Sequence, residues 1–569
     1  MSVNYKISIA NPAHHQLQVR VDLECPSDTF ICSLPVWSPG SYMVREYSRN
    51  LSKLKLTGSK GEFLELVQTK KNLWQAGLSA LKDKKITLSY DVYCHETTVR
   101  TSYIDHSHAF LHGPSVFMNI EGLENTEHIL QVDLPAEWTK ISTGLKDVSS
   151  TRETFLYSSD CYDNFIDCPI ELGNQETDGF MFSGLEHELA FYGTCFKHKH
   201  NLKKDIEIIV EHVSSYFDDI PYDRYVFITH FLPGIFGGLE HKNSTALQFD
   251  SSVLQNRKDY VNWLALVAHE YFHTWNVKRI RPSELGPFDY NQENYTSMLW
   301  LAEGLTSYMD DIMIYRANLC SLEEYLDIIK EKINQYHSIA GRHFDSLEAS
   351  SFNAWIKLYR PDENSKNSTV SYYLKGGLVF LSLQLLMVKE GKSVDQLTTK
   401  LWESYKARTE LGLKSDEVYE MIKEIAGDKI SLEFQRMIQT TEDIDFKNLF
   451  NQCGMDFVYE DTKNLKFGVT FNPSSKDVVV TSVELDSGAY KSGLNAGDEI
   501  LAVDGIRINS DRFKNLEKNL VENQSYTFLI SRRQMVFKLE VQCEVEDKKI
   551  SKIEVKDLEL TKRALAKFA

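Results

Sequence analysis

The segment best suited to chemistry is His269-Glu270-Tyr271-Phe272-His273. On a helix, residues four apart lie on one face, so the two imidazoles could bind one zinc ion with Glu270 beside it as a proton carrier. The preceding run from Val261 to Ala268 is apolar and lacks Gly and Pro, which predicts a buried helix that ends at Pro282. A chance copy of this pattern would more commonly lie on an exposed polar helix, where both histidines are solvated.

A third protein ligand is needed, because catalytic zinc usually has three and keeps one open position. Glu303 is the only acid in the otherwise apolar or small stretch from Leu299 to Tyr308. Its alternatives are an ion pair with a Lys or Arg, or a helix N-cap. Beside His269 and His273, the metal-ligand role is favoured.

The chemistry that such a site supports is hydrolysis. One Zn²⁺ held by two neutral histidines and one carboxylate keeps net positive charge, so it can polarise a carbonyl and lower the pKa of a water molecule. Glu270 would take a proton from that water and pass it to the leaving amine. Cleavage of an amide or similar acyl bond without a covalent enzyme intermediate is therefore predicted. Two His plus one Glu favour zinc among divalent metals.

Two further motifs could complete the site. Tyr372 and Tyr373 are candidate hydrogen-bond donors to a developing oxyanion, although a tyrosine is more commonly a core or rim residue. Glu240 follows Gly237 and Gly238, which we interpret as a Gly-rich turn that lets a substrate backbone approach closely. Glu240 could bind the free α-ammonium of a substrate, and the alternative is a solvated acid in a turn.

The pattern of elements predicts a multidomain α+β protein. Residues 1–170 alternate apolar and polar positions, as in 17–23 and 86–92, and form a β-rich N-terminal domain. Residues 171–450 form a catalytic region that begins as mixed α/β and continues as helices. Its clearest segments are a helix at 205–216, a strand at 225–231, a turn at 233–238, and helices at 322–336 and 415–426. Residues 455–545 return to short strands, and 546–569 form a charged tail, helical or frayed.

Composition narrows the classes of partner. The chain has 569 residues and a net charge of −18, which opposes binding to nucleic acid or to an anionic membrane. The longest apolar run, from Leu378 to Val388, is too short to span a bilayer and predicts a buried helix. No signal peptide is recognised, and nine scattered cysteines favour a reduced cytoplasmic compartment. A processed form of an exported protein remains open.

Together these segments resemble the glycyl aminopeptidase family of gluzincin metallopeptidases, which carry a PDZ domain near the C-terminus. That family is similar to the aminopeptidase N and leukotriene A4 hydrolase group, whose catalytic domain is thermolysin-like. The resemblance spans nearly the whole chain. It is carried by Pro35 to Glu46, Tyr162 to Glu171, Gly237 to His241, His269 to Pro282, Trp300 to Tyr308 and Tyr372 to Gly376.

The resemblance implies roles for individual positions. Zinc would be held by His269, His273 and Glu303, and Glu270 would be the general base. Glu240, with Gly237 and Gly238, would bind the substrate and its free amine. Tyr373 would stabilise the oxyanion, with Tyr372 as the alternative.

Two departures from the pattern of the aminopeptidase N group stand out. The 29 residues between His273 and Glu303 are more than in that group, which implies an insertion near Pro287 to Asn294. Leu239 and His241 replace a Met and an Asn beside the amine-binding Glu.

Residues 455–545 resemble a PDZ domain, in which Lys466-Phe467-Gly468-Val469 fits the loop that receives a peptide C-terminus. The peptide-binding positions would be Phe467 and Gly468. The alternative is a small β-domain that only packs on the catalytic one.

The leading hypothesis is a zinc aminopeptidase that acts on peptides with a free N-terminus and a small first residue, Gly or Ala being implied by the family. One alternative is a zinc endopeptidase whose PDZ domain recruits substrates. Another is a PDZ scaffold protein with a vestigial metal site.

Overall fold

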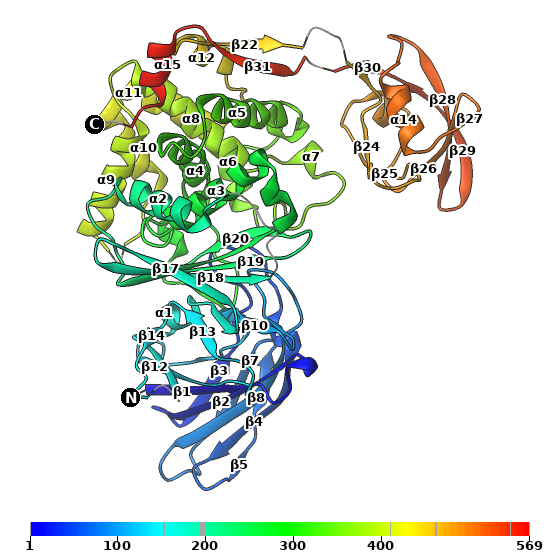
Figure 1. Ribbon diagram of the computed structural model, residues 1–569. Coiled ribbons are helices and arrows are strands. Elements are labelled where there is room, and N and C mark those ends of the chain that lie inside the picture. Colours follow the sequence, from blue (N-terminus) through cyan, green and yellow to red (C-terminus); the bar gives the residue numbers. More distant parts are fainter. Residues whose placement is uncertain are drawn as a thin grey trace. The chain divides into compact units, whose positions relative to one another are not determined.

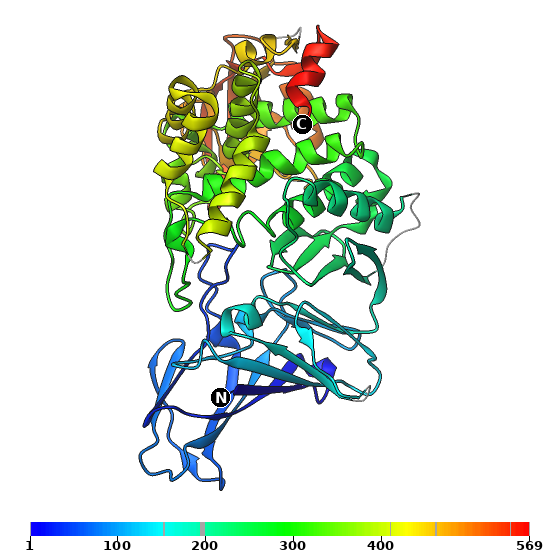
Figure 2. The ribbon, with the colours of Figure 1, turned by 90° about the vertical axis from the view of Figure 1, so that its left-hand side faces the viewer.

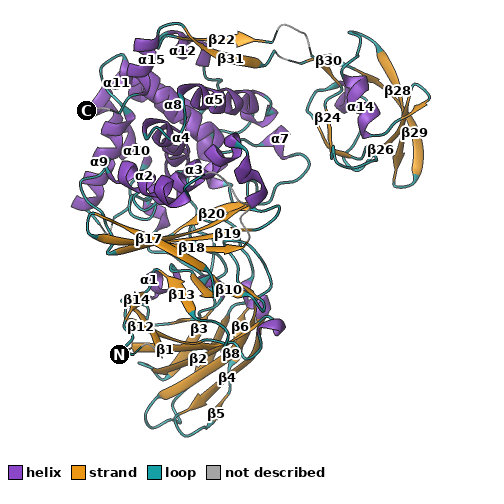
Figure 3. Cartoon of the chain, viewed as in Figure 1, coloured by secondary structure: helices purple, strands orange, loops and turns teal. Residues whose placement is uncertain are grey.

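The computed structural model describes residues 2–151, 154–193, 200–409, 411–460, 464–546 and 548–567. The chain forms two compact units whose segments interleave along the sequence. The first comprises Met1–Thr296, Met309–Cys320 and Thr398–Lys414, and the second comprises Ser297–Tyr308, Ser321–Leu397 and Ser415–Ala569. Strands dominate the first part of the chain and helices the middle (Figure 1, Figure 3). Cys195 lies outside the described residues, and the other cysteines are free thiols.

The N-terminal part of the first unit is built from three sheets (Figure 2). Alternation forms them: in β2 (Gln16–Glu24) the apolar residues at every second position are buried and the polar ones between them face outward, as the sequence predicts. The largest sheet has the order β14-β15-β12-β1-β2-β8-β4-β5. Its other strands are β14 (Lys146–Asp147), β15 (Phe155–Ser159), β12 (Glu127–Asp133), β1 (Ser2–Ser8), β8 (Lys85–Tyr93), β4 (Leu51–Gly58) and β5 (Phe63–Leu64).

Two four-stranded sheets complete this part, in the orders β13-β16-β10-β9 and β11-β3-β7-β6. Their strands are β13 (Lys140–Thr143), β16 (Ile170–Gly173), β10 (His108–Leu111), β9 (Tyr103–Ile104), β11 (Asn119–Ile120), β3 (Thr29–Ser33), β7 (Leu73–Gly77) and β6 (Val67–Lys70). The short helix α1 (Tyr162–Ile166) precedes β16.

A five-stranded sheet follows in the same unit. Its order is β17-β18-β19-β21-β20, with β18, β19 and β21 parallel and the edge strand β20 antiparallel. The strands are β17 (Glu176–Phe182), β18 (Leu185–Gly193), β19 (Arg224–Phe231), β20 (Phe236–Glu240) and β21 (Ser244–Phe249). Helix α2 (Leu202–Ser214) packs against α3 (Arg257–Phe272), which in turn packs against β20 and β21. The helix and the strand predicted here are confirmed.

The predicted Gly-rich turn is wrong in part. Gly237 and Gly238 lie inside the edge strand β20, paired with Gln248 and Leu247 of β21. Only Pro233 and Gly234 form the turn before it. Glycine is needed in this strand for close packing rather than for turning, because a side chain at Gly238 would enter the space held by Glu270.

Helix α3 ends earlier than the sequence predicts. Its last residue is Phe272, and His273 is the C-cap rather than an interior residue. The chain continues in turns to Pro282, because the backbone N–H of Lys278 donates to the carbonyl of His273 and that of Ile280 to the carbonyl of Trp275. The apolar residues that lead into the motif are buried, as predicted.

The segment inferred as an insertion near Pro287 to Asn294 lies against the N-terminal sheets. The backbone N–H of Val36 donates to the carbonyl of Tyr290, and the indole N–H of Trp37 donates to the carbonyl of Asp289. The Tyr290 side chain belongs to the core of the N-terminal part. This segment therefore holds the loop that follows Trp37.

The second unit is mainly helical. Helix α8 (Leu374–Val388) is almost wholly buried, which confirms the prediction for its apolar run. The neighbouring helices are α5 (Leu322–His337), α6 (Leu347–Phe352), α7 (Ser365–Ser368), α10 (Ser415–Ala426), α11 (Asp428–Gln439) and α12 (Phe446–Asn451). The division between the two units falls within helix α4 (Leu305–Arg316) and within helix α9 (Val394–Ala407). Among the described residues, no helix is long and apolar enough to cross a membrane.

A small β-domain is inserted into this unit between two paired strands, β22 (Met455–Tyr459) and β31 (Ile550–Val555). Its main sheet has the order β27-β26-β28-β29, and two shorter strand pairs complete it. Its elements are β23 (Leu465–Lys466), β24 (Val469–Phe471), β25 (Val480–Val483), α13 (Gly488–Lys491), β26 (Glu499–Val503), β27 (Ile506–Arg507), α14 (Ser510–Glu517), β28 (Ser525–Arg532), β29 (Met535–Gln542) and β30 (Glu544–Val545).

The segment that follows this domain is more ordered than the helical or frayed tail predicted from its charge. It forms strand β31 and then helix α15 (Leu558–Leu565), which packs against α8. In these two elements the charged residues alternate with apolar residues that are buried. Because the elements are short and mostly charged, their apolar pattern is hard to recognise in the sequence.

Candidate active site

The two histidines of the motif are held by partners at Nδ1. Nδ1 of His269 lies 2.8 Å from Oδ2 of Asp310, and Nδ1 of His273 lies 2.6 Å from the carbonyl oxygen of Asn276. Both partners only accept hydrogen bonds here, so each ring carries its proton on Nδ1 and presents Nε2 as the ligand nitrogen. The rings lie 4.6 Å apart at an angle of 87°. This tautomer is the one that a pair of metal ligands requires.

Three of the site residues inferred from the sequence converge within the first unit. Ligand atoms of Glu240, Glu270 and His273 lie within 4.8 Å of one another, and all three side chains are buried. Glu270 is placed by α3 and Glu240 by the end of β20. Gly238 packs against Glu270, because a methyl group on its Cα would lie 2.7 Å from Cγ of Glu270. The guanidinium of Arg100 donates to the carbonyl of Gly238 and fixes this stretch of the strand.

Glu240 is 3% exposed, so the reading of a solvated acid in a turn is wrong. Among the described residues, none donates a hydrogen bond to its Oε1. Gly40 of the loop after Trp37 closes over this carboxylate with φ of +81°, and a methyl group there would lie 2.7 Å from Cδ of Glu240. A buried carboxylate oxygen without a donor is costly, and a cationic ligand would relieve that cost.

A cavity of about 530 Å³ adjoins Glu240. Its lining includes the aromatic side chains of Trp37, Tyr42 and Phe288 and the cationic side chains of Lys278 and Arg281. The carboxylate therefore faces a space large enough for part of a peptide.

Glu303 lies in a π-helical turn, Trp300–Gly304, immediately before α4. Such turns are rare and recur at functional sites. The Glu303 side chain is buried.

The two tyrosines before α8 differ in their surroundings. Burial raises the pKa of Tyr373 well above its ordinary value, and the negative charge of Glu303 raises it further. Its hydroxyl therefore stays protonated and can donate a hydrogen bond. The hydroxyl of Tyr359 lies 3.4 Å from that of Tyr373, and the Tyr372 ring stacks on that of Tyr373. The charge of Glu303 acts on Tyr373, which favours Tyr373 as the donor near the metal ligand.

Lys375, within the same motif, is a buried structural residue. Its Nζ donates to the carbonyl of Thr440, 3.1 Å away, at the end of α11. Burial lowers its pKa to about 8. This bond ties the first turn of α8, next to Tyr373, to a neighbouring helix.

Four supporting residues were missed by sequence reasoning. Asp310 bonds His269, and the carbonyl of Asn276 bonds His273. Gly40 covers Glu240, and the hydroxyl of Tyr359 lies near that of Tyr373. Asp310 carried a weak signal in the sequence, because it is one of two adjacent acids that follow the candidate ligand Glu303 by about two helical turns. Asn276 is only three residues from His273, whereas Gly40 and Tyr359 act through contacts with residues further away in the sequence.

The loop for which peptide binding is predicted lies between β23 and β24 of the small domain. The Phe467 side chain is fully buried in the domain core, so only its backbone can face a ligand. Gly468 has φ of +83°, and a methyl group there would collide with Ser487. The carbonyls of Phe467 and Gly468 accept from the N–H groups of Ala489 and Glu484, which fixes the orientation of the loop.

Family models match three parts of the chain. Residues 4–174 match the Peptidase M61 N-terminal domain, residues 262–379 match M61 glycyl aminopeptidase, and residues 466–542 match the PDZ domain. A search of curated proteins finds no significant match.

Solved structures show the same arrangement. A crystal structure of an aminopeptidase N family protein from Idiomarina loihiensis is 28% identical, with a TM-score of 0.94 over 99% of this chain and 100% of that one. An M1 zinc metallopeptidase from Deinococcus radiodurans is 12% identical, with a TM-score of 0.52 over 78% of this chain and 94% of that one, and shows the fold alone. The multidomain organisation predicted from the sequence is confirmed.

Proposed function

We propose that this chain, a PDZ-containing metallopeptidase of the M61 glycyl aminopeptidase family, is a zinc aminopeptidase that removes a small N-terminal residue from peptides. The observation that carries the proposal is the convergence of Glu240, Glu270 and His273. Glu240 is a buried carboxylate whose Oε1 accepts from no donor among the described residues, and it lies beside the proposed proton carrier Glu270 and the proposed metal ligand His273. This is the arrangement needed to hold a free amine next to the bond that is cleaved.

The residues fit a zinc ion. His269 and His273 would present Nε2, because their Nδ1 atoms are bonded to Asp310 and to the carbonyl of Asn276. Glu303 would supply the carboxylate oxygen, which completes a set of two imidazoles and one carboxylate. Bound there, zinc would polarise the scissile carbonyl and make a water molecule more acidic.

The protein side chains would then divide the remaining work. Glu270 would accept a proton from the attacking water and deliver it to the leaving amine. Glu240 would hold the substrate ammonium as a charge-assisted pair, so that the first peptide bond lies at the metal centre. The Tyr373 hydroxyl would donate to the oxygen that becomes negative during attack.

Hydrolysis of Gly-, Ala- and Leu-p-nitroanilide beside N-acetyl-Gly-p-nitroanilide tests this function, with and without a chelator, on protein assayed for zinc. We expect chelator-sensitive cleavage of the free-amine substrates only, with Gly and Ala favoured. Glu270→Gln should keep its zinc and stop turnover. Cleavage that resists the chelator would contradict the mechanism. Zinc-loaded protein that cleaves only longer, N-blocked peptides would be an endopeptidase instead.

The PDZ domain has a separate proposed role. The loop at Phe467 and Gly468 would receive the C-terminus of a peptide through backbone amides. Binding of an N-terminally labelled peptide with a free C-terminal carboxylate, and of its amidated counterpart, to the full chain tests this role. Equal affinity for the two would exclude carboxylate recognition.

A further inference from the structure

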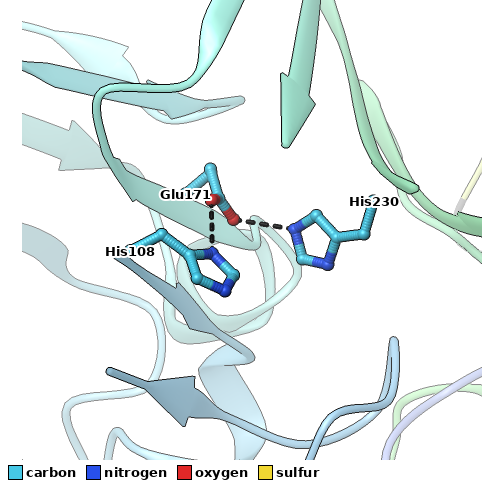
Figure 4. Close-up of side chains that lie close together, drawn as sticks. All are labelled: His108, Glu171 and His230. Atoms are coloured by element: carbon cyan, nitrogen blue, oxygen red, sulfur yellow. Dashed lines mark hydrogen bonds and ion pairs between the residues drawn. The ribbon is translucent and has the colours of Figure 1, made fainter. Parts of the chain in front are cut away.

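Outside the candidate active site, a carboxylate lies between two imidazoles in the interior of the first unit (Figure 4). Nδ1 of His108 is 2.7 Å from Oε1 of Glu171, and Nε2 of His230 is 2.9 Å from Oε2. The three residues are 1%, 0% and 2% exposed. No step proposed above uses them.

The cluster joins two sheets. His108 begins β10, and Glu171 lies in the neighbouring strand β16 of an N-terminal sheet. His230 lies in β19, the central strand of the five-stranded sheet β17-β18-β19-β21-β20, which we call the peptidase sheet. From β19 the sheet continues through β21 to β20, the strand that ends at Glu240. A bond between His230 and Glu171 therefore holds the peptidase sheet to the N-terminal domain.

The cluster must be close to neutral, since an unpaired charge is costly in such a site. Burial alone would raise the pKa of Glu171, but the two histidines lower it below its ordinary value. Glu171 is therefore ionised, and one of the two rings carries the compensating positive charge. Another carboxylate near His108, that of Asp105, accepts from the backbone N–H of His108 and from Ser107.

The surroundings of the rings decide which one is charged. Nδ1 of His230 is buried and has no hydrogen-bond partner among the described residues. A proton there would be an unsatisfied buried donor, at a cost of about 1–3 kcal/mol. His108 instead stacks on the face of Tyr192, with centroids 3.4 Å apart and planes at 13°. An aromatic face attracts a cation, so the positive charge belongs on His108.

The same distances argue against a metal ion. Two ligands at about 2.1 Å from a tetrahedral zinc lie about 3.4 Å from each other. The nitrogen–oxygen distances of 2.7 and 2.9 Å are those of charge-assisted hydrogen bonds, and each nitrogen has its own carboxylate oxygen. Binding through Nε2 of His230 would also place a proton on its buried Nδ1.

We infer that His108, Glu171 and His230 form a charge-compensated clasp, with an imidazolium at His108 and a neutral His230, and that it positions the peptidase sheet and Glu240 rather than holding a second metal. The Gly40 loop that closes over Glu240 belongs to the N-terminal domain, whereas Glu240 belongs to the sheet that the clasp holds. A displacement of this sheet relative to the Gly40 loop would open the proposed ammonium-binding site at Glu240. This last consequence rests on the proposed function, whereas the charge state does not.

Histidine-selective ¹³C NMR of the full chain tests the charge state, because an imidazolium and a neutral imidazole differ in their ring-carbon shifts. We expect an imidazolium signal that persists in the wild type and in His230→Gln but is absent from His108→Gln and Glu171→Gln. A signal lost in His230→Gln and kept in His108→Gln would overturn the assignment, as would the absence of any such signal in the wild type. Metal analysis should give one zinc per chain; a second equivalent lost in Glu171→Gln would show a metal site.

Steady-state kinetics on Gly-p-nitroanilide tests the positioning role. Glu171→Gln should raise KM several-fold and leave kcat nearly unchanged, because ammonium binding is disturbed while the metal ligands are not. Asp133→Asn is the matched control, since that carboxylate pairs with Lys6 at an exposed site. Unchanged KM, or a fall in kcat alone, would refute the role. If Glu171→Gln fails to fold, His108→Gln takes its place in the kinetic measurements. The NMR spectrum of the wild type still shows whether the cluster contains an imidazolium.

Discussion

Gly238→Ala is the change that tests the geometry of the proposed site most directly. The added methyl group would lie 2.7 Å from Cγ of Glu270 and nearer still to its carboxylate, whereas real Cβ contacts essentially never fall below 3.0 Å. The Glu270 side chain must therefore swing away by about 1 Å. A misplacement of that size in a catalytic group costs about 10²-fold in rate. We expect kcat on Gly-p-nitroanilide to fall by that factor.

Stability and metal content should change little in this variant, because the group that yields is the far end of a flexible side chain. Gly237→Ala is the matched control on the same strand. The nearest atoms to a methyl group there are Nη1 of Arg100 at 3.7 Å and Cγ2 of Val99 at 3.9 Å, which are ordinary contacts. A Gly238→Ala enzyme with wild-type kcat, or equal losses in the two variants, would refute the packing of Glu270 against Gly238.

Three further outcomes are expected. Glu240→Ala should lower kcat/KM on Gly-p-nitroanilide about 10- to 100-fold, since a hydrogen bond to a charged group contributes about 1.5–3 kcal/mol, and should leave inhibition by N-acetylglycine amide unchanged. Equal losses in kcat/KM for the free-amine substrate and in affinity for the N-acetylated inhibitor would reject ammonium binding. Tyr373→Phe should reduce kcat about 10²- to 10³-fold, and Tyr359→Phe less; an unaffected kcat in Tyr373→Phe would exclude it as the oxyanion donor. The pKa of Lys375 is about 8 in the folded chain, below that of an unfolded lysine, so the unfolded chain binds more protons between these two pH values. The free energy of unfolding of the wild type should therefore rise with pH in this range, by up to about 3 kcal/mol relative to Lys375→Met. Urea unfolding from about pH 7 to 10 measures that difference, and a constant difference would contradict the burial of the ammonium group.

The candidate catalytic residues could be found in the sequence because the chemistry proposed for them requires a fixed local spacing. His269 and His273 are four residues apart, a spacing that places two side chains on one face of a helix. Glu303 and Glu240 are acidic residues within apolar or Gly-rich stretches. Alternation likewise revealed strands such as β2 and β8. The placement of these residues around a common centre depended on the resemblance to a family rather than on spacing.

Other features could not be read in this way, because they are set by contacts between distant segments. Gly237 and Gly238 belong to a strand because β21 pairs with them and Glu270 fills the space above them. The end of α3 at Phe272 is set by carbonyls that accept from residues further along. The clasp unites residues 108, 171 and 230, and no local pattern links them.

The insertion of the PDZ domain has a consequence for synthesis of the chain. Strand β31 and helix α15 complete the helical region, where the Gln384 side chain of α8 bonds the carbonyl of Ala564 and Thr561 bonds the carbonyls of Cys453 and Gly454. A ribosome therefore makes the whole PDZ domain before the segment that covers α8. At about 5–20 residues per second, the nascent helical region waits roughly 5–20 s for its last pieces. During that interval the PDZ domain can fold first, and the peptidase becomes complete only afterwards.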